Sequence, residues 1–239
     1  MITVDPMKCR GCGTCVPYCT VGAIDLEDGL AIVDSHRCTD CYVCVRNNVC
    51  PAQAMHPAPL EGFNENFRHI LSDPTETTGE TGVPGRGTEE AKTNDVTGRF
   101  GRDEAGIAID MGRPGIGTRM SDVETVAKAV VRAGLRLEKP QTSPLGKVVD
   151  ISTGEMDPSI RDYYLLSIIV EGKCPLNRLR DVLKALKEVE DKIDTVFSVG
   201  LILRTDENGN HPSLRVVEEF GINPVRGKVN VGLGRPLVP

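Results

Sequence analysis

The spacing of the cysteines constrains this chain more than any other feature. Eight of the nine cysteines lie between residues 9 and 50, in two runs. The runs consist of Cys9, Cys12, Cys15 and Cys19, and of Cys38, Cys41, Cys44 and Cys50. Three thiolates two residues apart can surround three corners of a cubane cluster, and the fourth ligand must come from elsewhere in the chain. The pattern therefore predicts metal ligation rather than disulfides, and with it a reducing compartment.

The two runs form an internal duplication of about thirty residues. Residues 1–57 resemble a two-cluster bacterial-type ferredoxin, in which the fourth cysteine of each run ligates the other cluster. The resemblance implies two 4Fe-4S clusters with crossed ligands. One cluster would be held by Cys9, Cys12, Cys15 and Cys50. The other would be held by Cys38, Cys41, Cys44 and Cys19.

Two features depart from the family pattern. Thr20 stands where proline usually follows the first run, and five residues, 45–49, precede Cys50 where the family has three. We expect Arg46 and the asparagines of this insertion to lie in solvent, with contact to a partner as the alternative. Two four-cysteine zinc sites are the competing interpretation of the runs. Zinc knuckles pair two-cysteine units across a long gap, so the three-cysteine spacing favours cubanes.

The cysteine-containing module is predicted to include short strands. Residues 2–4, 23–26, 30–33 and 54–56 are the candidates, and Asp28-Gly29 is a hairpin signal between the second and third. Residues 58–103 then read as an irregular linker or a docking strap, because Gly, Pro, Thr and charged residues dominate. Within them, residues 61–71 are expected to make one or two helical turns.

Periodic structure returns in residues 104–206. Strands are expected at 106–111, 163–171 and 194–204, and amphipathic helices at 121–133 and 176–189. Residues 135–137 and 147–151 offer further strand material. Ser121 and Glu124 form a capping-box pattern for the first helix, and Pro175 suits the first turn before the second. The order strand, helix, strand, strand, helix, strand predicts a ferredoxin-like sandwich of the α+β class, similar in topology to ACT domains.

Residues 207–239 are predicted to form a short helix at 213–220 and an extended tail. The open face of the preceding sheet is expected to pair with another copy of the chain or with another protein. The Gly112–Arg119 loop lies between a strand and a helix, where it could bind an anion. It matches no nucleotide-binding motif, so a tight turn is the preferred interpretation.

The other chemistry-bearing residues point to structural roles. Cys174 precedes a predicted helix, which could activate a thiolate, but a lone cysteine is more often a buried packing residue. The histidines His36, His56, His69 and His211 show no metal-binding spacing, although the first two flank the cluster module and could tune it. We expect solvated or capping roles for those two.

Net charge and hydropathy bear on the partners and the cellular compartment of the chain. The net charge is −6, and no basic patch is evident, which argues against nucleic acid as a partner. The longest apolar run, residues 165–170, is too short to span a bilayer, and no signal peptide is evident. These features predict a cytoplasmic protein without direct membrane insertion.

The sequence thus favours an electron-transfer subunit that relays single electrons through two 4Fe-4S clusters. Because no flavin, nicotinamide or molybdopterin motif is evident, its partner would be a flavin- or metal-containing catalytic subunit of a larger oxidoreductase complex. Such a complex is expected to work under anaerobic conditions. Whether the chain is itself an enzyme stays open. One alternative is a self-contained iron-sulfur reductase with a substrate site in the C-terminal domain. Another is a redox- or ligand-sensing regulatory protein.

Overall fold

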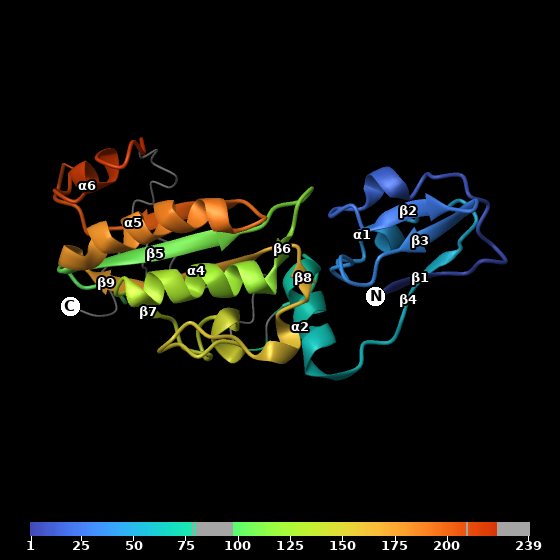
Figure 1. The fold of residues 1–239 in the computed structure, drawn as a ribbon, viewed down its shortest axis with the longest axis horizontal. Helices are drawn as coiled ribbons and strands as arrows, with labels where there is room; N and C mark the ends of the chain where they lie inside the picture. The colour runs from blue at the N-terminus through green and yellow to red at the C-terminus, as the bar shows by residue number, and fades with distance from the viewer. Residues whose placement is uncertain (78, 80–97, 209, 224–239) are drawn as a thin grey trace.

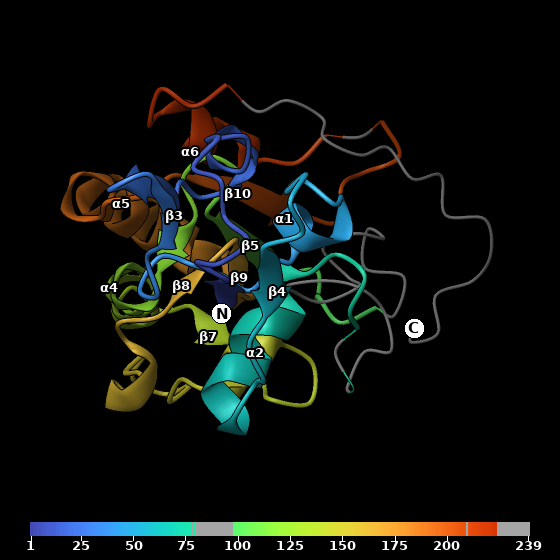
Figure 2. The ribbon, with the colours of Figure 1, turned by 90° about the vertical axis from the view of Figure 1, so that its right-hand side faces the viewer.

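The computed structural model describes residues 1–77, 79, 98–208 and 210–223. Figure 1 shows an elongated molecule with two lobes. The N-terminal lobe comprises residues 1–57, and the C-terminal lobe comprises the described residues from 98 onwards. Helix α2 (Gly62–Ser72) lies between the lobes, beside strand β8 (Tyr164–Leu165) in both views (Figures 1 and 2).

The N-terminal lobe is built from two small antiparallel strand pairs. Its elements are β1 (Ile2–Val4), 3-10 helix η1 (Val16–Tyr18), β2 (Ile24–Glu27), β3 (Leu30–Val33), α1 (Val43–Arg46) and β4 (Met55–Pro57). Strand β1 pairs with β4, and β2 pairs with β3. The predicted turn between β2 and β3 is confirmed, since Asp28 (φ 49°) and Gly29 (φ 77°) both have positive φ.

The C-terminal lobe contains a four-stranded antiparallel sheet in the order β10-β5-β9-β7. These strands are β10 (Phe197–Ile202), β5 (Glu104–Met111), β9 (Ile168–Pro175) and β7 (Arg136–Leu137). Helices α4 (Met120–Arg132) and α5 (Leu179–Val189) lie side by side on one face (Figure 1). The smaller elements are β6 (Thr118–Arg119), η2 (Pro144–Lys147), η3 (Pro158–Ile160), η4 (Leu176–Arg178), η5 (Glu190–Lys192) and α6 (Leu214–Glu218).

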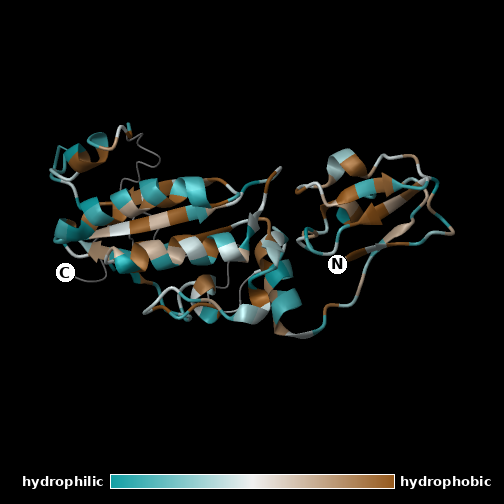
Figure 3. Ribbon diagram, in the orientation of Figure 1, coloured by the Kyte–Doolittle hydropathy of each residue, from teal (hydrophilic) through white to brown (hydrophobic). Residues whose placement is uncertain are grey.

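Burial of apolar side chains explains this arrangement. Helices α4 and α5 mix hydrophobic and hydrophilic residues, and strands β5 and β9 are rich in hydrophobic residues (Figure 3). Fully buried residues come from both layers and form one core, as at Ile107, Met120 and Leu179. The predicted mixture of helix and strand is therefore confirmed, and the six elements β5, α4, β7, β9, α5 and β10 follow the expected order.

Several element predictions were wrong in detail. Residues 147–151 form no strand, because a 3-10 helix beginning at Pro144 occupies the approach and only an isolated bridge joins Val149 to Met156. The single strand predicted at 163–171 is divided, since β8 pairs with β6 and only β9 joins the main sheet. Pro175 ends β9, and α5 begins four residues later, after η4.

The predicted capping box at α4 does not form. Arg119 occupies the N-cap position, and no side chain caps the helix. The carboxylate of Glu124, which is only 9% exposed, accepts hydrogen bonds from Met156 N (3.0 Å) and Arg161 Nη2 (2.8 Å). Tertiary partners outside the helix have taken the residue that local sequence assigned to the cap.

The stretch predicted as an irregular linker contains an eleven-residue helix. Helix α2 spans eleven residues, where one or two turns were expected, and Phe67 and Leu71 are buried in the core of the C-terminal lobe. This packing supplies the stability that the local sequence lacks, because short helices in proteins depend on burying an amphipathic face. Residues 78 and 80–97 of the predicted strap, and the extended tail from 224 onwards, lie outside the described residues.

Candidate metal centre

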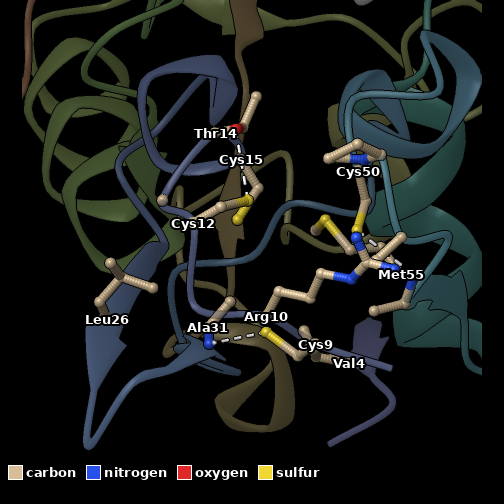
Figure 4. Close-up of a pocket in the computed structure, with 14 residues that line it drawn as sticks. Val4, Cys9, Arg10, Cys12, Thr14, Cys15, Leu26, Ala31, Cys50 and Met55 are labelled. Carbon is tan, nitrogen blue, oxygen red and sulfur yellow. Dashed lines mark hydrogen bonds between the residues drawn. The ribbon is translucent and has the colours of Figure 1, made fainter. Parts of the chain in front are cut away.

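The first cysteine pocket collects side chains from both runs. Cys9, Cys12 and Cys15 of the first run line it together with Cys50 of the second (Figure 4). Apolar side chains complete most of its wall, at Val4, Leu26, Ala31, Pro51, Ala52, Ala54 and Met55. Cys12 is exposed, so this pocket reaches the surface of the N-terminal lobe.

The second pocket has the complementary set. Cys38, Cys41 and Cys44 of the second run line it with Cys19 of the first. Its wall is also largely apolar, with Ile2, Val21, Ala23, Ile24, Val33 and Val43 among the lining residues. The fourth cysteine of each run thus lies in the pocket of the other run. Among the described residues, no group of three or more His, Cys, Asp or Glu side chains is arranged to hold a single metal ion.

Backbone amides point at the sulfur atoms in a repeated pattern. Ala23 N donates to Cys19 Sγ (3.0 Å), and Ala54 N donates to Cys50 Sγ (3.3 Å), each four residues after its cysteine. Ala31 N donates to Cys9 Sγ at 3.4 Å. Hydrogen bonds of this kind favour the charged thiolate, which is the form that binds metal.

Three threonines add hydroxyl groups to the pockets. Thr20 Oγ1 lies 3.2 Å from Cys41 Sγ, and Thr14 Oγ1 lies 3.4 Å from Cys12 Sγ. Thr39 lines the second pocket with its hydroxyl buried and without a hydrogen-bond partner among the described residues. A buried unpaired hydroxyl is costly. A group with acceptor atoms in the pocket would remove this cost, so the residues present fit an inorganic cluster with sulfide corners.

The pKa values of the pocket thiols also indicate a metal group. Burial, with smaller contributions from the neighbouring Cys41, Cys38 and Cys19, raises the pKa of Cys44 to about 12. Burial also raises the pKa of Cys15, with additional contributions from the other three cysteines of its pocket. Four thiolates this close repel one another unless a cation lies between them. Each pocket is therefore suited to a positively charged metal group that deprotonates its ligands.

The two pockets differ in their surroundings. The second pocket adjoins the C-terminal lobe, because Gly115 N donates to Thr20 O (2.5 Å) directly after Cys19. The Arg37 guanidinium, next to Cys38, lies 5.7 Å from the ring centre of Tyr164. Within the Gly112–Arg119 loop, Gly117 N donates to Arg113 O (2.8 Å), which forms a turn, and Gly115 contacts the N-terminal lobe. That contact had no signal in the local sequence.

The remaining candidates have structural surroundings. Cys174 is fully buried in β9, where burial raises the pKa of its thiol to about 11, in agreement with a packing role. His36, His56 and His211 are not buried, whereas His69 is buried on α2 with Nδ1 2.7 Å from Asp40 O. Spacing alone gave no reason to expect His69 beside the second run.

The insertion before Cys50 is not simply solvated. Arg46 ends helix α1, pairs with Asp73 (2.6 Å) beyond α2, and donates to Cys41 O (3.0 Å). Burial of Asp73 acts to raise the pKa of its carboxyl. The hydrogen bonds from Thr75 and Arg46 together outweigh burial and hold this pKa below its ordinary value. Arg46, Asn47 and Asn48 are exposed, as expected from the sequence, but the carboxylate partner of Arg46 was not expected. The extra residues position a cation that a carboxylate distant in sequence can reach.

Comparison with known proteins identifies the N-terminal segment. Residues 2–25 match the Fer4 family, described as a 4Fe-4S binding domain. A ferredoxin-like protein in the vnf region of Azotobacter chroococcum mcd 1 is 35% identical over 40 residues, which is 17% of this chain and 62% of that protein. Ferredoxin-1 of Rhodobacter capsulatus is 37% identical over 38 residues, which is 16% of this chain and 58% of that protein.

The chain therefore carries a ferredoxin-type, iron-sulfur electron-carrier domain at its N-terminal end that binds a 4Fe-4S cluster. It spans about three fifths of the length of the curated relatives that it matches. The remainder of the chain is not recognised, and no solved structure matches it. No helix in the described parts of the chain is both long and apolar enough to cross a membrane.

Proposed function

We propose that the chain is an electron-transfer subunit with two 4Fe-4S clusters, working with a catalytic partner of a larger oxidoreductase complex. Cys9, Cys12, Cys15 and Cys50 would hold one cluster. Cys38, Cys41, Cys44 and Cys19 would hold the other. The observation that carries this proposal is the presence of two four-cysteine pockets, each with one ligand exchanged between the runs.

The clusters would supply one-electron chemistry, and the protein would set their distance, potential and access. Apolar walls limit water around the sulfur atoms, and amide and hydroxyl donors stabilise the charge on them. The exposed Cys12 marks the first pocket as the side on which a partner can approach closely. The second pocket, beside the C-terminal lobe, would hold the inner relay site.

The C-terminal lobe supports a positioning role better than a catalytic one. The two features that sequence offered for a substrate site are accounted for otherwise. The Gly112–Arg119 loop contacts the N-terminal lobe through Gly115, and Cys174 is buried in the sheet. The catalytic chemistry is accordingly assigned to a partner that carries a flavin or a metal centre, and the C-terminal sheet is a candidate surface for assembly.

The test begins with protein purified anaerobically from its native source. We expect close to eight irons per chain, from two clusters of four, and a stoichiometric partner that contains a flavin or metal and exchanges electrons with the reduced chain. Four irons per chain would remove the second cluster from the proposal. Substrate turnover by the isolated chain would overturn its assignment as a non-catalytic subunit.

A further inference from the structure

A buried carboxylate lies inside the second cysteine run. Asp40, between Cys38 and Cys41, is 0% exposed, and its backbone has a positive φ of 56°. A charged carboxylate removed from water is strongly unfavourable unless it is paired and hydrogen-bonded. The conformation of this short loop therefore depends on whatever pairs with Asp40.

The pairing group comes from helix α2. Arg68 Nε donates to Asp40 Oδ2 (2.8 Å), and Arg68 Nη2 lies 2.5 Å from the same oxygen. The Arg68 side chain is itself only 7% exposed, so water screens this pair little. The amino group of Met1 lies 2.9 Å from the other oxygen, Oδ1.

Two further contacts join α2 to the same run. His69 Nδ1 lies 2.7 Å from the carbonyl oxygen of Asp40, and the ring of His69 packs on that of Tyr42 with centres 4.3 Å apart. Tyr42 lies between Cys41 and Cys44. One turn of α2 thus contacts the loop through side-chain charge, backbone and aromatic packing.

The same helix is also attached to the C-terminal lobe. Phe67 and Leu71 belong to its core, and Ser72 Oγ accepts a hydrogen bond from Leu166 N (3.1 Å). The Arg68 guanidinium also lies 4.9 Å from the ring centre of Tyr163. Arg68 therefore touches the second cysteine run and the C-terminal lobe at once.

We propose that α2 braces the second cluster site against the C-terminal lobe, with Arg68 as its positioning residue. This inference rests on the proposed two-cluster function. The Asp40–Arg68 pair holds the loop from Cys38 to Cys41 in the conformation that presents its thiols to the pocket. Loss of Arg68 leaves a buried charge without its main partner, which loosens the second site and leaves the first site intact.

The experiment examines each cluster by itself in the full-length chain. Arg68→Leu and Arg68→Lys are introduced into two backgrounds, Cys12→Ala, which retains the second cluster, and Cys41→Ala, which retains the first. Iron release to a chelator and the midpoint potential are measured in each. Arg180→Leu is the matched control, because Arg180 forms an exposed pair with Glu219 far from both pockets.

In the Cys12→Ala background we expect Arg68→Leu to speed iron release by about tenfold or more, since breaking a buried pair is strongly destabilising. Its midpoint potential should shift, and Arg68→Lys should restore much of both properties. Arg180→Leu and the Cys41→Ala background should show neither change. Equal changes in iron release from both clusters would mean that Arg68 stabilises the whole fold, which would overturn the proposal. No change in iron release from the second cluster would overturn it as well. Because the unsubstituted chain is assayed for iron first, a chain with four irons would count against the two-cluster function instead.

Discussion

Replacement of Cys50 tests the crossed arrangement of ligands most directly. Cys50 belongs to the second run by sequence, but in the structure it lines the pocket of Cys9, Cys12 and Cys15. Cys50→Ala should therefore damage the first cluster and spare the second. The reciprocal control is Cys19→Ala, which should damage the second cluster, because Cys19 lies in the pocket of Cys38, Cys41 and Cys44.

The magnitude follows from counting ligands in each pocket. If four thiols surround each of two clusters, as proposed, the intact chain should hold about eight irons. Removal of one thiol leaves three corners ligated, so iron should fall to about seven if a three-iron cluster survives and to about four if the cluster is lost. The same loss is expected from Cys12→Ala, because both residues serve one pocket.

Double substitutions distinguish pocket membership from run membership. Residues that act on one unit are non-additive, whereas independent sites add. The pair Cys12→Ala with Cys50→Ala should keep about four irons, the same as the lower limit of either single variant. The pair Cys41→Ala with Cys50→Ala should lose both clusters. Iron and sulfide analysis, with electron paramagnetic resonance of the reduced protein, measures this. If the pair with Cys12 lost everything and the pair with Cys41 kept half, ligation would follow the runs and the argument from the pockets would be refuted.

Three further predictions concern the C-terminal lobe, and each is tested by denaturant unfolding of the full chain. Ser121→Ala should be nearly neutral and Glu124→Ala should cost about 1–3 kcal/mol, because Glu124 binds Met156 N and Arg161 and not the helix end; the reverse order would restore the capping box. Gly117→Ala should lower the free energy of unfolding more than Gly115→Ala does. Both glycines have positive φ, but only at Gly117 would a Cβ lie 3.0 Å from atoms of Val21 and Leu165. Equal losses would contradict the close approach of those two residues to Gly117. Burial raises the pKa of Cys174 from 9.0 to about 11, so its stabilisation is complete below pH 9 and lost as the pH rises towards 11. Cys174→Ala should flatten the stability profile in that window, and an unchanged slope would contradict the assignment.

The cysteine runs show how far local pattern reaches. Their spacing indicated cubane ligation, and the family resemblance implied which cysteines group together. The hairpin at Asp28-Gly29 was equally readable, because a two-residue turn depends on the φ values that those residues tolerate. The apolar periods of α4 and α5 were readable for a similar reason, since each helix buries one face within its own length.

Predictions failed where a residue has its partner far along the chain. Glu124 matched a cap locally, but Met156 and Arg161 compete for its carboxylate. Arg46 is exposed, as expected, but the sequence gave no sign of the pair that it forms with Asp73 at 2.6 Å. The length of helix α2 was underestimated for the same reason, because its stability comes from a core to which its own sequence contributes only a few residues.

The sequence by itself therefore determined the chemistry that the chain can carry: thiol ligands at fixed short spacing, in two copies, among apolar residues. Tertiary structure alone decided how unequal the two sites are. One pocket reaches solvent at Cys12, and the other lies against the C-terminal lobe, where Arg68 neutralises Asp40. Spacing along a chain specifies ligands because residues a few positions apart are held close together by the chain itself. Burial and charge compensation depend on surfaces that meet only after folding.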